Sequence, residues 1–202
     1  MNTVGLIAFA VVGATKAIRE EFDVFGVTVV GLVTAFAGGA TRDLLVNRVP
    51  LALRSFGEIS LGLLGVGLAI GLSVLLKAPD DHPIARLSDA VGLGAFATAG
   101  AIVATEAGVA GFGVIAIATI NAVGGGAFAD ILLDRSPFIL FDDFYASCAV
   151  LGSSTYWVAT TLVGTDSLAA ALCATVTITT RLAAVTYGWD LPTVQMLGLA
   201  RK

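Results

Sequence analysis

The sequence predicts an all-α membrane protein in which two inverted three-helix repeats and a final helix make seven transmembrane spans. Two observations lead to this fold class. Hydrophobic residues make up 57% of the 202 residues and charged residues 13%, whereas a soluble domain carries about 25% charged residues. The mean hydropathy of +0.94 agrees with a chain that is mostly surrounded by lipid. The second observation is an internal duplication.

Residues 4–50 recur without a gap as residues 91–137, a shift of 91 − 4 = 87, and about 20 of the 47 aligned positions are identical. Each copy, with its tail, contains three apolar spans, and an odd number of spans forces the second copy to enter the membrane upside down. Many membrane proteins build a polar path at the bilayer midplane from inverted repeats with interrupted helices. The duplication therefore predicts a protein that lets a solute cross the membrane.

Seven apolar segments are long enough to cross a bilayer. We predict helices over Thr3–Ala17, Phe25–Leu45, Phe56–Leu76, Leu87–Thr105, Gly108–Leu133, Tyr145–Val163 and Leu168–Tyr187. The first is interpreted as a membrane helix rather than a cleaved signal peptide, because it lacks a positively charged start and recurs in mid-chain. The first repeat then covers residues 1–76 and the second residues 87–163, and residues 168–202 hold the seventh helix and a cytoplasmic tail.

The distribution of Lys and Arg predicts that the N-terminus lies outside the cell membrane and the C-terminus in the cytoplasm. Cytoplasmic loops carry an excess of basic residues, and this orientation puts seven on the inner side against three on the outer side. The inner set is Lys16, Arg19, Lys77, Arg86, Arg135, Arg201 and Lys202, and the outer set is Arg42, Arg48 and Arg54.

The second and fifth predicted helices each carry a glycine cluster in mid-span, Gly38-Gly39 and Gly124-Gly125-Gly126. Each glycine costs about 1 kcal/mol in a helix relative to alanine, and such clusters allow a kink. Carbonyl groups freed by a kink are tolerated at membrane depth where protein or a water-filled cavity covers them. Close helix packing is the alternative reading. The matched positions favour kinks that line a polar path.

Polar side chains flank both glycine clusters. Thr34 precedes the first cluster and Asn121 holds the equivalent place before the second, while Asp43 and Asp130 follow at equivalent positions. A carboxylate in a membrane segment by default indicates a functional site, and at a pore mouth it concentrates cations. Near the end of a span the carboxylate could equally be solvated, or paired with a neighbour such as Arg42.

Two further basic residues lie in predicted helices. Lys16 ends the first helix, and its equivalent in the second copy is Val103. We expect Lys16 to snorkel to the membrane interface, although it could instead project into a pore and gate it. Arg181 lies deep in the last helix, which indicates a protein partner or a lipid headgroup.

Other functions find little support in the sequence. There is no Ser–His pairing, metal-ligand spacing or phosphate-binding glycine loop, so we expect neither enzymatic activity nor a cofactor or metal. The two cysteines, Cys148 and Cys173, lie in apolar runs and are expected to be packing residues. The net charge of −4 argues against binding of nucleic acid.

The residues around the first glycine cluster resemble a known family signature. This signature comprises Asp23-Val24-Phe25-Gly26, then Thr34 to Leu45 (TAFAGGATRDLL), then Val49-Pro50, and the second copy matches it from Phe112-Gly113 to Pro137. It is similar to a bacterial and archaeal membrane family described as "glycine transporter" domains, the prokaryotic branch of the TRIC (trimeric intracellular cation) channels. The resemblance covers nearly the whole chain.

The resemblance implies a homotrimer in membrane lipid, with one pore per subunit that passes monovalent cations (K⁺ and Na⁺), chiefly potassium. The first, second, fourth and fifth predicted helices would line the pore, and the glycine kinks would form its constriction. Ala37 replaces a glycine of many relatives, which implies a milder first kink. The Lys-Glu-Val lipid-binding tripeptide of animal members is absent. The alternative function is a secondary transporter of a small amino acid such as glycine.

Overall fold

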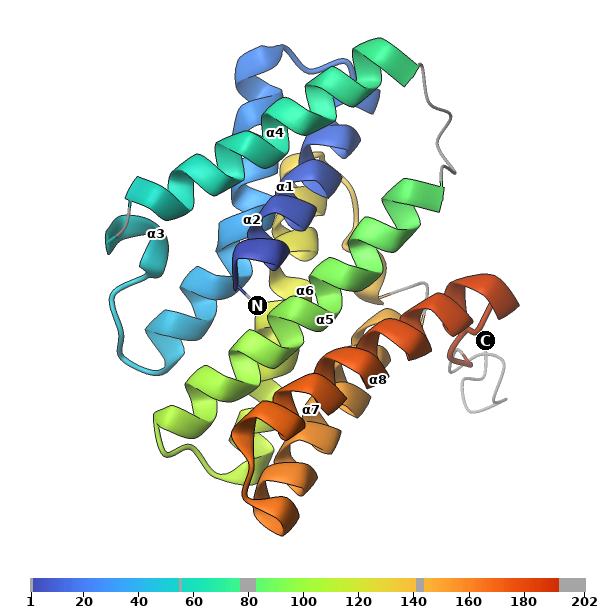
Figure 1. Cartoon of the computed structure of the whole chain (residues 1–202). Helices are drawn as coiled ribbons and strands as arrows, with labels where there is room; N and C mark the ends of the chain where they lie inside the picture. The colour runs from blue at the N-terminus through green and yellow to red at the C-terminus, as the bar shows by residue number, and fades with distance from the viewer. Residues whose placement is uncertain (1, 55, 77–82, 141–143, 193–202) are drawn as a thin grey trace, which may run out of the picture.

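A computed structural model describes residues 2–54, 56–76, 83–140 and 144–192. Within these ranges the chain forms eight α-helices and one 3-10 helix, without strands (Figure 1). They are α1 (Asn2–Arg19), α2 (Val24–Leu45), α3 (Leu51–Arg54), α4 (Phe56–Leu76), α5 (Pro83–Glu106), α6 (Gly111–Leu132), η1 (Phe138–Leu140), α7 (Tyr145–Val163) and α8 (Asp166–Tyr187). The seven long helices match the seven predicted segments. The predicted cytoplasmic tail beyond residue 192, and most of the loop that joins the repeats, lie outside the described residues.

The sequence analysis missed two short helical turns, and it misplaced the starts of α5 and α6, which were predicted at Leu87 and Gly108. Both turns directly follow equivalent prolines, Pro50 before α3 and Pro137 before η1. Proline fixes φ near the helical value and is favoured at the first position of a helix, so this signal could have been used. The predicted start of the fifth helix at Gly108 is wrong, because Gly108 has a φ of 72° and helix α6 begins only at Gly111.

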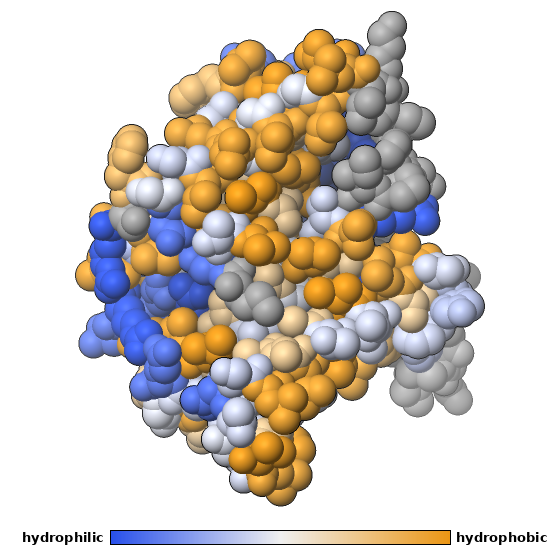
Figure 2. All heavy atoms as spheres, viewed as in Figure 1, coloured by the Kyte–Doolittle hydropathy of each residue, from blue (hydrophilic) through white to orange (hydrophobic). Residues whose placement is uncertain are grey.

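Five helices of the described chain are long and apolar enough to cross a membrane, namely α2, α4, α5, α6 and α8. By this criterion alone the seven-span prediction is not reached, since α1 and α7 fall outside the set. Helix α1 carries Lys16 and Arg19 in its last turn. Figure 2 shows that hydrophobic side chains cover most of one face of the molecule, with hydrophilic side chains gathered at the edge near α3.

Four helices form a ring at the centre of the fold. Helix α1 packs against α2 and α5, and α6 packs against the same two helices, while the diagonal pairs share few contacts. Helix α4 covers the ring beside α1 and α2, and α7 and α8 cover it beside α5 and α6 (Figure 1). The ring therefore consists of the first two long helices from each copy of the repeat.

Helices α2 and α6 cross through their glycine clusters, and both helices run uninterrupted through them. A Cβ atom on Gly38 would overlap the backbone carbonyl oxygen of Asn121, and a Cβ on Gly125 would overlap that of Thr34. The two contacts are equivalent, because each residue of one pair lies 87 positions from its counterpart in the other. Neither helix unwinds at its glycines, and close packing, the alternative reading of the sequence, accounts for Gly38 and Gly125. A bend that keeps the helical hydrogen bonds stays a prediction.

Candidate functional site

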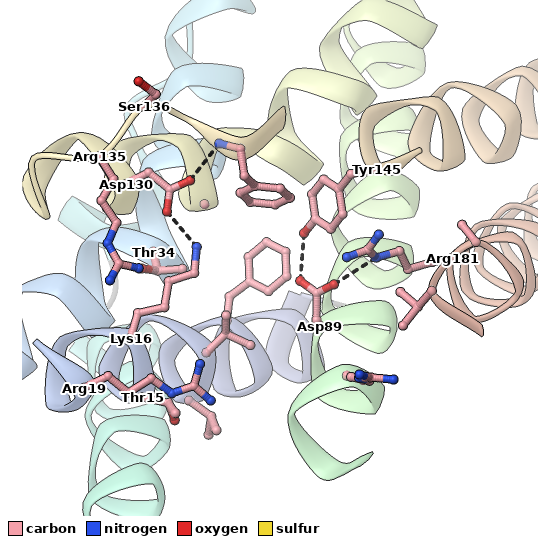
Figure 3. A pocket seen from close by; sticks show the side chains of 18 of the residues that line it. Thr15, Lys16, Arg19, Thr34, Asp89, Asp130, Arg135, Ser136, Tyr145 and Arg181 are labelled. Atoms are coloured by element: carbon pink, nitrogen blue, oxygen red, sulfur yellow. Dashed lines mark hydrogen bonds and ion pairs between the residues drawn. The ribbon is translucent and has the colours of Figure 1, made fainter. Parts of the chain in front are cut away.

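A cavity of about 590 Å³ opens at the end of the bundle where α1 and α6 finish. Its walls come from α1, α2, α5, α6 and α8, together with η1 and the first residue of α7. Figure 3 shows two polar groups on opposite walls, one around Lys16 and Asp130 and one around Asp89 and Arg181. The cavity reaches inward to Thr34 and Gly126, next to the crossing of α2 and α6.

Lys16 and Asp130 form an ion pair in the cavity wall, with the Lys16 Nζ atom 2.7 Å from Asp130 Oδ1. The Lys16 ammonium also lies 4.9 Å from the centre of the Phe138 ring. The other carboxylate oxygen of Asp130 accepts a hydrogen bond from the backbone N–H of Phe138 at 3.2 Å. Lys16 thus projects into the cavity, which is the alternative that the sequence analysis left open, and its position relative to the membrane interface stays a prediction. A buried carboxylate, with its side chain 5% exposed, draws the ammonium into the cavity.

Asp43 is placed in the same way at the other end of the ring. Its Oδ2 accepts a hydrogen bond from the N–H of Leu51 at 2.9 Å, and Leu51 is the equivalent of Phe138. Its Oδ1 lies 2.7 Å from the Arg42 guanidinium, and both side chains are only 6% exposed. The ion pair with Arg42 that the sequence left open is thus present. A hollow of about 10 Å³, which is close to the volume one water needs, lies beside this pair.

Thr34 and Asn121 are both buried at the α2–α6 crossing. The Thr34 hydroxyl donates a hydrogen bond to the carbonyl of Val30 in its own helix. The Asn121 side chain instead bridges two helices, since its Nδ2 donates to the carbonyl of Phe96 in α5 at 2.5 Å. Asn121 Oδ1 has no hydrogen-bond partner among the described residues, and a Cβ atom on Gly39 would lie 3.7 Å from it.

The members of the two glycine clusters differ in their surroundings. Gly39 lines the small hollow, and Gly126, its equivalent, lines the large cavity. A Cβ atom on Gly126 would meet only Phe138, at 3.5 Å. A Cβ on Gly124 would come within 3.1 Å of the Gly38 Cα atom. The last glycine of each cluster, Gly39 or Gly126, therefore borders a hollow. The glycines before it, Gly38, Gly124 and Gly125, allow α2 and α6 to pack closely.

The sequence analysis missed a second polar group in the large cavity. Asp89 in α5 accepts hydrogen bonds from the Tyr145 hydroxyl at 3.0 Å and from Arg181 Nε at 3.1 Å. The Arg181 Cζ atom lies 4.5 Å from the centre of the Tyr145 ring. Arg181, for which the sequence indicated a protein partner or a lipid headgroup, thus contacts side chains of its own chain, and these contacts tie α8 to the cavity wall.

The repeat contained a usable signal for this group. Asn2 and Glu58 are the equivalents of Asp89 and Tyr145, and Asn2 Nδ2 donates to Glu58 Oε2 at 3.2 Å. Both pairs are 56 residues apart. Extending the alignment beyond residues 4–50 would have paired these positions and marked them as an equivalent polar contact.

The two ends of the ring thus have the same arrangement of side chains but differ in the basic residue that pairs with the carboxylate. Each end holds a carboxylate, a hollow and a glycine, while the basic partner comes from non-equivalent positions, Lys16 in α1 and Arg42 in α2. The large cavity and the small hollow have no lining residue in common.

Solved structures share this fold. One, determined in work on conductance through TRIC cation channels, is 35% identical with a TM-score of 0.86, and covers 95% of this chain and 94% of that chain. A prokaryotic TRIC channel in 0.5 M KCl is 32% identical with a TM-score of 0.82, and covers 94% of this chain and 96% of that chain. The chain belongs to the prokaryotic TRIC family. A TRIC trimeric intracellular cation channel orthologue from Rhodobacter sphaeroides has a TM-score of 0.83 at 29% identity, over 93% of this chain and 96% of that chain.

Sequence relatives of this TRIC-family chain agree with that assignment. The family model described as glycine transporter matches residues 1–74 and 86–161. The UPF0126 membrane protein YvgT of Bacillus subtilis is 40% identical over 153 residues, which is 75% of each chain. The UPF0126 inner membrane protein YadS of Escherichia coli is 30% identical over 200 residues, covering 96% of this chain and 94% of its own. TRIC membership thus extends over nearly the full length of the chain.

Proposed function

We propose that this protein is a channel for monovalent cations, with a preference for potassium, built as a homotrimer with one pore in each subunit. The observation that carries the proposal is the pair of hollows that enter the α1–α2–α6–α5 ring from opposite ends, each bordered by a carboxylate. Such a path inside the ring gives every subunit its own pore. The similarity to TRIC cation channels supports the same conclusion.

The pore is closed in the form described, and its opening requires movement at the centre of the ring. Bends of α2 at Gly38-Gly39 and of α6 at Gly124-Gly125-Gly126 would separate the two helices where they cross, while the ends of both helices stay in position. Glycine pairs are among the positions at which helices bend sharply. We therefore assign the glycine clusters two roles: tight packing when the pore is closed, and flexibility when it opens.

A secondary transporter of a small amino acid is the second candidate, because the matching family model is described as glycine transporter. A carrier alternates access to a closed binding site at the interface of the repeats, whereas a channel offers a continuous wet path with weak sites. Hollows that enter from opposite ends suit either function when the centre is closed.

Recording from the purified protein in planar bilayers separates the two functions. For a channel we expect discrete single-channel current steps in potassium chloride, with a reversal potential that favours K⁺ over Cl⁻. A carrier would give saturable glycine uptake in proteoliposomes without current steps, and that result would replace the channel proposal. Chemical crosslinking of the same detergent sample is expected to end at a trimer band, and crosslinking that stops at a dimer would contradict the homotrimer.

The orientation of the chain is a further expected result. We infer that the N-terminus lies outside and the C-terminus in the cytoplasm, because seven basic residues then lie on the inner side against three on the outer side. A cysteine added after Lys202 is expected to be protected from a membrane-impermeant thiol reagent in intact cells and labelled after permeabilisation. A cysteine added before Met1 serves as the control and is expected to react in intact cells. The reverse labelling pattern would overturn the orientation.

A further inference from the structure

Two phenylalanine rings lie between the large cavity and the small hollow. Phe9 in α1 lines the large cavity, and Phe96 in α5, its equivalent 87 positions later, lines the small hollow. The ring centres are 4.9 Å apart and the ring planes are nearly perpendicular, at 84°. Each residue is only 2% exposed. The two rings therefore touch each other while each borders the hollow at its own end of the molecule.

Glycine residues at equivalent positions hold each ring in place. A Cβ atom on Gly5 in α1 would lie 2.6 Å from the Phe96 ring, and a Cβ on Gly92 in α5 would overlap the Phe9 ring. Each helix thus carries one aromatic ring and, one turn earlier, the glycine that receives the ring of the other helix. This reciprocal Gly-x-x-x-Phe arrangement brings α1 and α5 together at the centre of the ring of helices.

Helix α6 of the ring also contacts the phenylalanine pair. A Cβ atom on Gly125 in α6 would lie 3.5 Å from the Phe9 ring. The carbonyl of Phe96 accepts the hydrogen bond from Asn121 Nδ2, which ties α5 to α6 at this level. The aromatic pair therefore lies directly beside the crossing of α2 and α6, where the two hollows approach each other.

Polar groups border this pair on each side, but the rings themselves offer a cation no hydrogen-bonding atom. Thr34 lines the large cavity, and Asn121 Oδ1 lies near Gly39, which lines the small hollow. Hydrophobic constrictions of this kind stop ion flow by excluding water from a short length of the pore. A cation that passes between the rings would lose its hydration shell before it reached the polar side chains on the opposite side of the pair.

We propose that Phe9 and Phe96 form the hydrophobic gate of the pore, and that separation of the two rings determines when cations pass and how large they can be. The proposal rests on the proposed channel function, and it places the barrier on α1 and α5 rather than on the glycines of α2 and α6. Movement at the glycine crossing then opens the pore by giving the rings room to part.

Truncation of the rings tests this gate in planar bilayers. We expect Phe9→Ala, Phe96→Ala and the double variant to raise the potassium open probability, by about tenfold for the double variant, which corresponds to ~1.4 kcal/mol in the free-energy difference between the closed and open states. We also expect tetramethylammonium, which is larger than K⁺, to become permeant. The matched control is Leu93→Ala, because Leu93 is fully buried in the same helix as Phe96 and contributes to neither hollow.

The outcomes separate the gate from the channel function. If the wild type carries K⁺ current and the folded phenylalanine variants behave as Leu93→Ala does in open probability and tetramethylammonium permeability, the gate is overturned and the channel function stands. If neither the wild type nor any variant carries current, both proposals fail. Current that appears only in the phenylalanine variants would support the gate.

Smaller changes cover the case in which the alanine variants do not fold. Phe9→Leu and Phe96→Leu keep most of the side-chain volume and hydrophobicity, and core substitutions of this kind are tolerated best. We expect both to shift open probability in the same direction as alanine, by a smaller factor. Leucine variants that fold as stable oligomers and match the wild type in both measurements would also overturn the gate.

Discussion

A Gly125→Ala variant is expected to lose most of its folded protein, whereas Gly126→Ala, one residue along the same helix, is expected to remain folded. A Cβ atom at position 125 would overlap the backbone carbonyl oxygen of Thr34 in α2, and a backbone atom cannot turn away as a side chain can. Overpacking of this kind costs about 3 kcal/mol. At position 126 the nearest atom would be 3.5 Å away, and alanine gains up to ~1 kcal/mol of helix propensity.

Thermal unfolding in detergent, together with the yield of oligomer in size-exclusion chromatography, measures this difference. Gly38→Ala and Gly39→Ala form an independent matched pair in α2, because Gly38 packs on the Asn121 carbonyl oxygen while Gly39 has only ordinary contacts. Equal stability of the two variants in each pair would show that the α2–α6 crossing is not held by glycine contact.

The same variants bear on the predicted bends. Gly39 and Gly126 border the hollows, so alanine is tolerated at both positions while the helix becomes stiffer. If bending of α2 and α6 opens the pore, Gly126→Ala is expected to reduce potassium current without reducing the yield of oligomer. Comparison of Gly125→Ala with Gly126→Ala thus distinguishes the packing role of glycine from its effect on helix flexibility in α6.

Hydropathy and the internal repeat predicted the long helices because both signals are spread over many residues. The limits of α4 and α7 were predicted to the residue, and Ser55, Lys77 and Gly164 adjoin three of these four limits. The misplaced start of α6 depended on a single backbone angle, at Gly108. A glycine can end a helix in the left-handed region or lie within one, and the sequence alone does not distinguish these cases.

The candidate site was harder to predict because its contacts cross between helices. Asp43 and Asp130 were recognised from the repeat, and the structure places both at the hollows. Their basic partners are not equivalent, since Arg42 is next to Asp43 in sequence while Lys16 reaches Asp130 from another helix. An ion pair 114 residues apart leaves no local pattern. The same holds for Asp89 and Arg181, which are 92 residues apart.

The Lys16–Asp130 pair gives a large expected change in potassium conductance. An Asp130→Asn variant is expected to reduce potassium conductance, and Lys16→Met to increase it, because each removes one charge of a neutral pair in the cavity wall. Asp130→Asn leaves the ammonium facing the path, and Lys16→Met leaves the carboxylate. For an ion about 7 Å away, at an effective dielectric constant of about 40, one charge changes the ion energy by ~1 kcal/mol. That energy corresponds to about a fivefold change in ion occupancy.

Salt dependence and a double variant distinguish this electrostatic effect from damage to the fold. The change is expected to be largest below 0.1 M salt, where the screening length exceeds about 10 Å. Lys16→Met combined with Asp130→Asn removes both charges and is expected to return conductance towards that of the wild type. Glu106→Gln is the matched control, because Glu106 forms an exposed ion pair with Arg48 and borders neither hollow. Conductance that is unchanged in folded Asp130→Asn and Lys16→Met channels at low salt would show that cations do not pass this pair.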